Sequence, residues 1–261
     1  MKPKKIVYYE DPLNDEFSGT RIKRIPLGEN YRYYSNNIFY RALSWFLYWV
    51  IAYPILWLVA KIGYHVHVAG KKNRKLTRGQ GVFYYGNHTQ IIDAFTAQLF
   101  AAQGKRTYIV CNQDTTSIKG IRWLVKMLGC IPTPENPQEA EKYKDCIRKR
   151  IKQKRGISIF PEAHIWPYST HIRPFGDESF SFPAELGAPV VAMAVTYRKR
   201  KVFKNRPPHV TIHLSRPHYP NMKLSLPERK KELRDFVYEY LLDTVSEEEN
   251  QEYIAYVRKK D

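Results

Sequence analysis

The chain has 261 residues, a length that suits one domain with one sizeable core. Its 43 Lys and Arg against 25 Asp and Glu give a formal charge of +18, which indicates a polyanionic partner: nucleic acid, an anionic membrane surface or a phosphorylated substrate. The N-terminus lacks the apolar core and cleavage pattern of a signal peptide, so secretion by that route is not expected.

The three cysteines are Cys111, Cys130 and Cys146. They are widely separated and lack Cys-x2-Cys or Cys/His ligand spacing, so the sequence predicts neither a disulfide framework nor a metal site. A reducing, cytosol-facing catalytic domain fits this pattern.

Residues 1–37 show no lasting periodicity and are predicted to form an irregular arm. Residues 38–62 follow as a membrane-associated helical segment, because Leu43 to Ala60 is an uncharged run of 18 residues that contains three of the five Trp. As a helix this run is about 27 Å long, barely the hydrocarbon thickness. Pro54 should kink it, so we favour a bent helix in one leaflet over a full span or a buried core helix.

Residues 63–261 alternate between strand and helix patterns. The sequence therefore predicts a single α/β domain with a largely parallel mixed sheet flanked by helices. The expected strands are 64–69, 82–85, 107–111, 157–160, 190–195 and 209–214, and the expected helices end near 104 or cover 118–128, 138–154 and a segment from 225 onward.

The stretch Gly81 to Asp93, GVFYYGNHTQIID, places His88 on a strand-to-helix turn. His88 and Asp93 are five positions apart, so their side chains meet only if His88 precedes the first helical turn and Asp93 lies within it. A general base and its orienting carboxylate require that geometry.

A second polar group follows the strand 157–160, where Phe160-Pro161-Glu162 puts a carboxylate at the strand's C-terminal end. The chain has no Gly-x-Ser-x-Gly elbow and no cysteine with a recognisable His partner. With His88 as base and Asp93 as its orienter, a substrate hydroxyl could attack a carbonyl, and backbone N–H groups of the helix start would be available to the oxyanion. If that carbonyl belongs to a thioester, no protein nucleophile is needed.

The combination of Asn87-His88-x4-Asp93 with Phe160-Pro161-Glu162, followed by an apolar strand with Pro189 near its start, resembles the glycerolipid acyltransferase family, between about Tyr64 and Thr196. The type member of that family is 1-acylglycerol-3-phosphate acyltransferase. The resemblance implies a membrane enzyme at the cytosolic face that needs no cofactor, takes acyl-CoA or acyl carrier protein as donor, and acylates lysophosphatidic acid or a related lipid alcohol. It assigns catalysis to His88 and Asp93, and substrate binding to Asn87 and Glu162.

The chain departs from the family at its phosphate-binding arginines. Ala163-His164-Ile165 follow Glu162 where the family has Gly-Thr-Arg, and residues 129–135 lack the arginine of the second motif. Lys119, Arg122 and Arg173 are the candidate substitutes, chosen by nearness in sequence, and Arg173 is the first choice. For each of them an ordinary surface base is the competing interpretation. Glu162 itself could bind acceptor hydroxyls, fix a neighbouring Arg or merely cap its turn.

Two other functions stay open. The first is acylation of another lysophospholipid or of an amino-acid-containing lysolipid. The second is a non-catalytic basic module that binds membrane or nucleic acid. No RNA-binding signature, zinc finger or helix-turn-helix pattern is present, and nucleic-acid binding would leave the apolar run unexplained, so we expect lysolipid, acyl donor and an anionic membrane surface as partners, and no nucleic acid.

Overall fold

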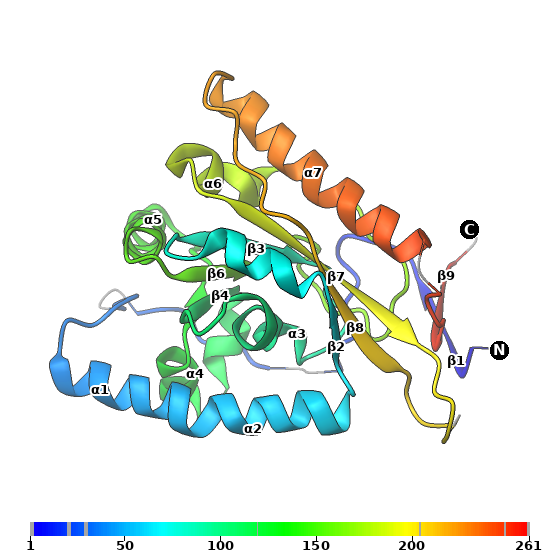
Figure 1. The fold of residues 1–261 in the computed structure, drawn as a ribbon. Coiled ribbons are helices and arrows are strands. Elements are labelled where there is room, and N and C mark those ends of the chain that lie inside the picture. Colours follow the sequence, from blue (N-terminus) through cyan, green and yellow to red (C-terminus); the bar gives the residue numbers. More distant parts are fainter. Residues whose placement is uncertain are drawn as a thin grey trace.

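The protein is described from a computed structural model, which covers residues 3–19, 22–28, 31–118, 120–203, 205–247 and 249–259. Its centre is a seven-stranded sheet in the order β2-β8-β7-β3-β6-β4-β5 (Figure 1). Only the β7–β8 pair is antiparallel among its neighbouring strands, so the predicted largely parallel mixed sheet is confirmed. The strands are β2 His67–Ala69, β3 Val82–Gly86, β4 Thr107–Cys111, β5 Cys130–Pro132, β6 Gly156–Ile159, β7 Val190–Arg198 and β8 His209–Leu214.

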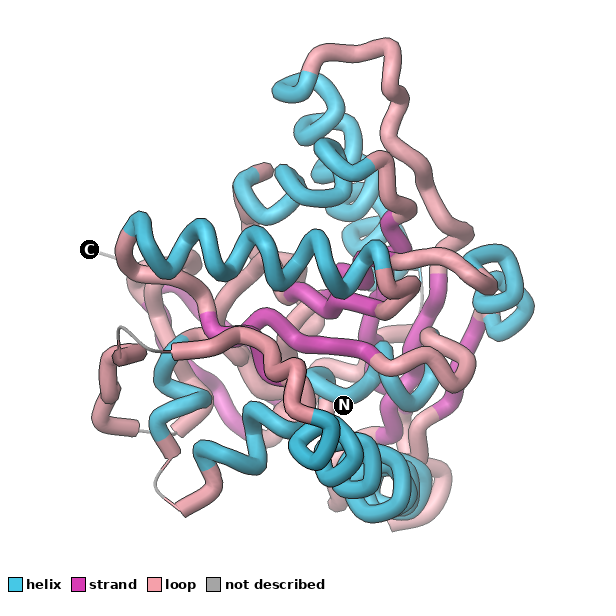
Figure 2. Tube along the Cα trace, turned by 90° about the vertical axis from the view of Figure 1, so that its left-hand side faces the viewer, coloured by secondary structure: helices cyan, strands magenta, loops and turns pink. Residues whose placement is uncertain are grey.

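Helices cover both faces of this sheet, as a mainly parallel sheet requires (Figure 2). The α-helices are α1 Ile38–Phe46, α2 Tyr53–Leu58, α3 Asp93–Thr96, α4 Arg122–Met127, α5 Pro137–Lys152, α6 Ser181–Leu186 and α7 Leu226–Glu247. Wider π-helical turns form Leu47–Ala52, Val59–Gly63 and Ala97–Ala101, and short 3₁₀ turns form Lys71–Thr77, Gln113–Ser117 and Glu178–Phe180.

Strand β3 shows how the sequence builds two cores. Its side chains alternate between the two faces of the sheet. Phe83 and Tyr85 join the core under α5, α6 and α7. Val82 and Tyr84 join the core that contains the segment after His88 and the end of the apolar helix. All four side chains are buried, which explains why the strand reads as a continuous apolar run.

The apolar run forms one continuous helix from Ile38 to Gly63, long and apolar enough to cross a membrane. It does not break at Pro54, which lies in the first turn of α2, directly after the π-helical turn Leu47–Ala52. Two side chains attach the helix to the rest of the domain: Ser44 Oγ donates to the Met127 carbonyl of α4 at 2.7 Å, and Tyr48 Oη accepts from the Thr107 N–H of β4 at 2.9 Å.

The helix lies along the domain instead of standing away from it (Figure 1). Ser44, Tyr48 and Ala60 are buried against the domain, at three levels of the helix. Its other side exposes Ile38, Phe39, Leu43, Trp45, Phe46, Val50, Ile51, Ile55, Trp57, Leu58, Val59 and Ile62. The helix therefore packs one side on the domain and leaves an apolar side exposed along its length.

Two expectations from the sequence are wrong. Cys111 and Cys130 form a disulfide, because the adjacent strands β4 and β5 bring residues 19 apart in sequence to a Cα separation of 6.3 Å. The cysteine argument for a reducing compartment therefore fails. Part of the N-terminal arm is also regular: β1, Lys5–Tyr9, pairs in parallel with β9, Ile254–Arg258, near the other end of the chain. The division at residues 37 and 62 stays a prediction.

Candidate active site

His88 lies at the carboxyl edge of the sheet, two residues after β3 ends. Asp93 begins α3, so the geometry that the spacing requires is present. The His88 Nδ1 atom is 3.6 Å from Asp93 Oδ2, and the carboxylate is completely buried. Since Nδ1 faces Asp93, the chemistry of the ring is left to Nε2, and the imidazole itself stacks on Phe160 with ring centres 4.4 Å apart.

Asp93 also shapes the turn that holds the imidazole. Its Oδ2 accepts hydrogen bonds from the backbone N–H groups of Thr89 and Gln90, both at 2.6 Å. His88 Nδ1 and Asp93 Oδ1 are both buried without a hydrogen-bond partner. At 3.6 Å the His88–Asp93 contact is longer than a hydrogen bond, and such catalytic contacts often tighten only when substrate binds.

The backbone N–H groups that donate to Asp93 are not free to stabilise an oxyanion. We expected the helix start to offer backbone donors to an oxyanion. The N–H groups of Thr89 and Gln90 already donate to the carboxylate. Stabilisation of a tetrahedral intermediate would therefore have to come from other donors.

Glu162 ties the second motif to the first. Its Oε2 accepts from the backbone N–H of His88 at 3.2 Å and from Arg173 Nη2 at 3.2 Å, and its Oε1 accepts from the backbone N–H of Arg173 at 2.9 Å. Burial raises the pKa of Glu162, and the Arg173 guanidinium opposes that rise. Of the roles left open from sequence, fixing a neighbouring arginine matches this geometry.

Arg173 is 4% exposed. Besides Glu162, its Nη2 contacts the carbonyl of His164, and its guanidinium lies 4.8 Å from the ring centre of Trp166. Burial lowers the pKa of Arg173. Binding of an acceptor phosphate by this side chain stays a prediction. Only Nη2 of the guanidinium is engaged by Glu162, whereas Nε and Nη1 are buried without a hydrogen-bond partner.

The other predicted binding residues have different surroundings. Asn87 is buried, and its amide exchanges hydrogen bonds with the backbone of Val195 in β7, at 3.1 and 2.8 Å. Arg122 lines a cavity of about 400 Å³ with Trp123, and that cavity contains none of the motif residues. Lys119 lies outside the described residues. Across the described ranges, no three His, Cys, Asp or Glu side chains are grouped to hold a metal.

Sequence reasoning missed Tyr197, near the end of β7. Its hydroxyl donates to Thr89 Oγ1 at 2.7 Å and accepts from Gln90 Nε2 at 3.2 Å. Burial raises the pKa of Tyr197 well above its usual range, so the hydroxyl stays protonated. The tyrosine thereby supports the turn that carries Asp93. A tyrosine closing an otherwise apolar strand was the available signal, because a buried hydroxyl needs a partner.

Comparison with known proteins agrees with this geometry. The model of the family described as Acyltransferase matches residues 65–196, half of the chain. The chain belongs to the acyltransferase family. A solved structure with a similar fold is the 1-acyl-sn-glycerophosphate (LPA) acyltransferase PlsC from Thermotoga maritima, with 16% sequence identity and a TM-score of 0.58, over 82% of this chain and 91% of that one. No curated protein matches the sequence significantly.

The Glu162–Arg173 pair generates the first prediction for this acyltransferase. Arg173→Ala leaves a buried carboxylate without its partner, which should lower the free energy of unfolding by about 3–5 kcal/mol. Thermal or denaturant unfolding of the purified protein in detergent measures this loss.

The double variant Glu162→Gln/Arg173→Met serves as the control, because it removes both charges together. It should recover much of the stability lost in Arg173→Ala. Wild-type stability of Arg173→Ala would show that the pair contributes little to the fold.

Proposed function

We propose that this acyltransferase moves a fatty acyl group from acyl-CoA or acyl carrier protein to the hydroxyl of 1-acylglycerol-3-phosphate, which makes phosphatidic acid for phospholipid biosynthesis. The observation that carries the reaction type is the buried Asp93 carboxylate 3.6 Å from Nδ1 of His88, at the carboxyl edge of the sheet. The acceptor is suggested by the motif resemblance and by the named activity of the Thermotoga maritima protein.

In the proposed reaction Nε2 of His88 takes the proton from the acceptor hydroxyl as its oxygen attacks the thioester carbonyl. The carbon–sulfur bond then breaks, and the thiolate leaves with the proton that the imidazolium returns. Asp93 stabilises the imidazolium between these two steps. No bond forms between the acyl group and the protein, so no nucleophilic side chain is needed.

Substitution of the two motif residues tests this reaction. His88→Ala should lower kcat by roughly 10²- to 10⁴-fold, since the general base is lost. Asp93→Asn should also impair turnover severely, because the ring loses its orienting charge and the imidazolium loses the carboxylate that stabilises it. Release of free thiol from acyl-CoA, in detergent with a lysolipid acceptor, measures both effects.

His171→Ala is the matched control, since that imidazole lies on a loop and its side chain is 68% exposed. It should retain wild-type turnover. Turnover near the wild-type rate in folded His88→Ala would refute the assignment of the base.

A second candidate keeps the reaction and changes the acceptor to another lysophospholipid or an amino-acid-containing lysolipid. Arg173 favours it, because its buried guanidinium is engaged by Glu162 and the chain lacks the family's other phosphate-binding arginines. An acceptor without a phosphomonoester would not need such an arginine.

Acceptor assays separate the two candidates. If phosphate recognition matters, lysophosphatidic acid should give a kcat/KM at least tenfold above that of lysolipids without a phosphomonoester, the ratio expected from one charge-assisted hydrogen bond of about 1.5–3 kcal/mol. If Arg173 supplies that bond, Arg173→Ala should raise KM for lysophosphatidic acid alone. Equal kcat/KM across the panel would favour the second candidate.

We also propose that the helix Ile38–Gly63 holds the enzyme in the cytosolic leaflet, with its exposed apolar side in the lipid. Aromatic side chains on that side, including Trp45 and Trp57, suit the interface between headgroups and acyl chains. The basic composition of the chain adds attraction to anionic lipid.

Charges on the exposed side of this helix should release the protein from membranes. Phe39 is 81% exposed and Ile55 is 55% exposed, so Phe39→Glu/Ile55→Glu leaves the contacts with the sheet intact. We expect the double variant to bind phospholipid vesicles at least tenfold more weakly in flotation, since two large apolar groups leave the lipid.

Leu242→Glu provides the comparison, because Leu242 is an exposed apolar residue of α7, away from this helix. Its flotation should match that of the wild type. Full-length protein that stays off the vesicles would contradict the membrane placement.

A further inference from the structure

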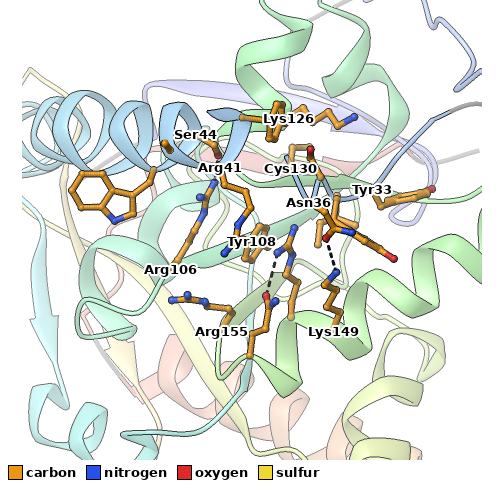
Figure 3. Close-up of a pocket in the computed structure, with 18 of the residues that line it drawn as sticks. Tyr33, Asn36, Arg41, Ser44, Arg106, Tyr108, Lys126, Cys130, Lys149 and Arg155 are labelled. Atoms are coloured by element: carbon orange, nitrogen blue, oxygen red, sulfur yellow. Dashed lines mark hydrogen bonds between the residues drawn. The ribbon is translucent and has the colours of Figure 1, made fainter. Parts of the chain in front are cut away.

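A cavity of about 790 Å³ opens between α1, the start of β4 and the end of α5 (Figure 3). None of its lining residues is acidic. Six of them carry positive charge: Arg41, Arg106, Lys126, Lys149, Arg150 and Arg155. Neither His88 nor Asp93 lines this cavity. The cavity is larger than the one beside Arg122.

The cavity and the catalytic histidine lie at opposite edges of the sheet. Arg106 and Arg155 immediately precede the neighbouring parallel strands β4 and β6, and their strands are in register at Thr107 and Gly156. His88 follows the end of β3, which is parallel to β6. Strands of four or five residues separate the two edges by about 15 Å. The cavity is therefore a separate site.

Arg106 shows that the positive charge is built into the cavity wall. Its guanidinium lies between the rings of Tyr48 and Tyr108, and its Nη2 donates to Ser44 Oγ at 2.8 Å and to the Met127 carbonyl at 2.6 Å. Its Nε is buried without a hydrogen-bond partner. All these partners are neutral, so none of them neutralises the positive charge of the Arg106 guanidinium.

The neighbouring cations are likewise held against neutral groups. Lys149 Nζ lies 3.6 Å from the ring centre of Tyr34, and the Arg150 guanidinium lies 4.2 Å from that of Tyr108. Burial lowers the pKa of Lys126 and of Arg106. At Arg106, repulsion from Arg150 and Arg155, which also line the cavity, adds to this lowering of the pKa. An anion in the cavity would relieve this repulsion.

The cavity also has an apolar border. Ile38, Trp45 and Trp49 of the long helix line it, and Trp45 is largely exposed. The exposed apolar side of the helix begins at the same place, with Phe39. A ligand with a phosphate and acyl chains would satisfy both parts of the site, whereas a nucleotide phosphate would use only the cations.

We propose that this cavity binds the headgroup phosphate of an anionic glycerophospholipid, whose acyl chains follow the exposed side of the helix. The site is distinct from the acceptor site and rests on the proposed membrane placement of the helix. It anchors the amino edge of the sheet to anionic lipid while the carboxyl edge carries out acyl transfer.

Titration calorimetry of the full chain in detergent tests this site with dihexanoyl phosphatidylglycerol, below the concentration at which the lipid forms micelles. This phosphodiester lacks the phosphomonoester of the proposed substrate and product. We expect one lipid per chain. Arg41→Gln/Arg155→Gln should weaken binding about 30-fold, the loss expected for two cations at about 1 kcal/mol each.

Arg41 and Arg155 are suitable because both are exposed, and thermal unfolding confirms that the double variant is folded. Lys126→Gln provides a second variant and should weaken binding in the same direction. Lys223→Gln/Lys231→Gln makes the same change in net charge next to and within α7, which contributes no residue to the cavity, and should bind as the wild type does.

Other probes distinguish the sources of the phosphate. Dihexanoyl phosphatidylcholine should bind at least tenfold more weakly than the anionic lipid. Inorganic phosphate that binds as tightly as the lipid, or coenzyme A whose binding is lost in Arg41→Gln/Arg155→Gln, would overturn the lipid assignment. Equal lipid binding by Arg41→Gln/Arg155→Gln and the wild type would overturn the site itself.

His88→Ala separates this proposal from the catalytic one. The variant should bind dihexanoyl phosphatidylglycerol with wild-type affinity, because the cavity contains no part of the motif. A failure of the catalytic assignment would appear as retained turnover in His88→Ala, and a failure of the lipid site would appear in the titrations alone.

Discussion

The Asp93 carboxylate is the group on which the candidate active site depends. It is completely buried, and two backbone N–H groups donate to it while the imidazole lies beside it. The same hydrogen bonds close the turn between β3 and α3, and Tyr197 supports that turn through Thr89. One charge therefore both folds the turn and orients the histidine that the turn carries.

A second buried charge connects this turn to the rest of the carboxyl edge. Glu162 accepts the N–H of His88 and pairs with Arg173, so the end of β3, the end of β6 and a later loop meet at one carboxylate. Trp166 N–H adds a bond to the His88 carbonyl at 3.1 Å. Asp93 and Glu162 of the two motifs therefore both fix the position of His88. A motif residue can be needed for this positioning without contacting substrate.

Six of the seven strands of the central sheet and most of the longer helices were predictable, because apolar runs and regular spacing report local structure directly; the three-residue strand β5 was not predicted. The strand at 82–85, the helix at 138–154 and the apolar helix from residue 38 were all indicated by residues close in sequence, and the structure forms each of them within two residues of these bounds. The predictions that failed concern contacts between distant segments. The Cys111–Cys130 disulfide and the β1–β9 pair exist because of strand order, and strand order leaves no local pattern.

The sequence alone predicted the approach of His88 to Asp93, since residues five positions apart meet only if His88 precedes the first helical turn and Asp93 lies within it. Only the tertiary structure decided the surroundings of Glu162 and Arg173, and the gathering of cations from α1, α4, α5 and the residues just before β4 and β6 into one cavity. The physical reason is that the sequence around a charged side chain does not indicate whether that side chain is solvated or buried. Its partners are brought to it by packing of elements far apart in the chain.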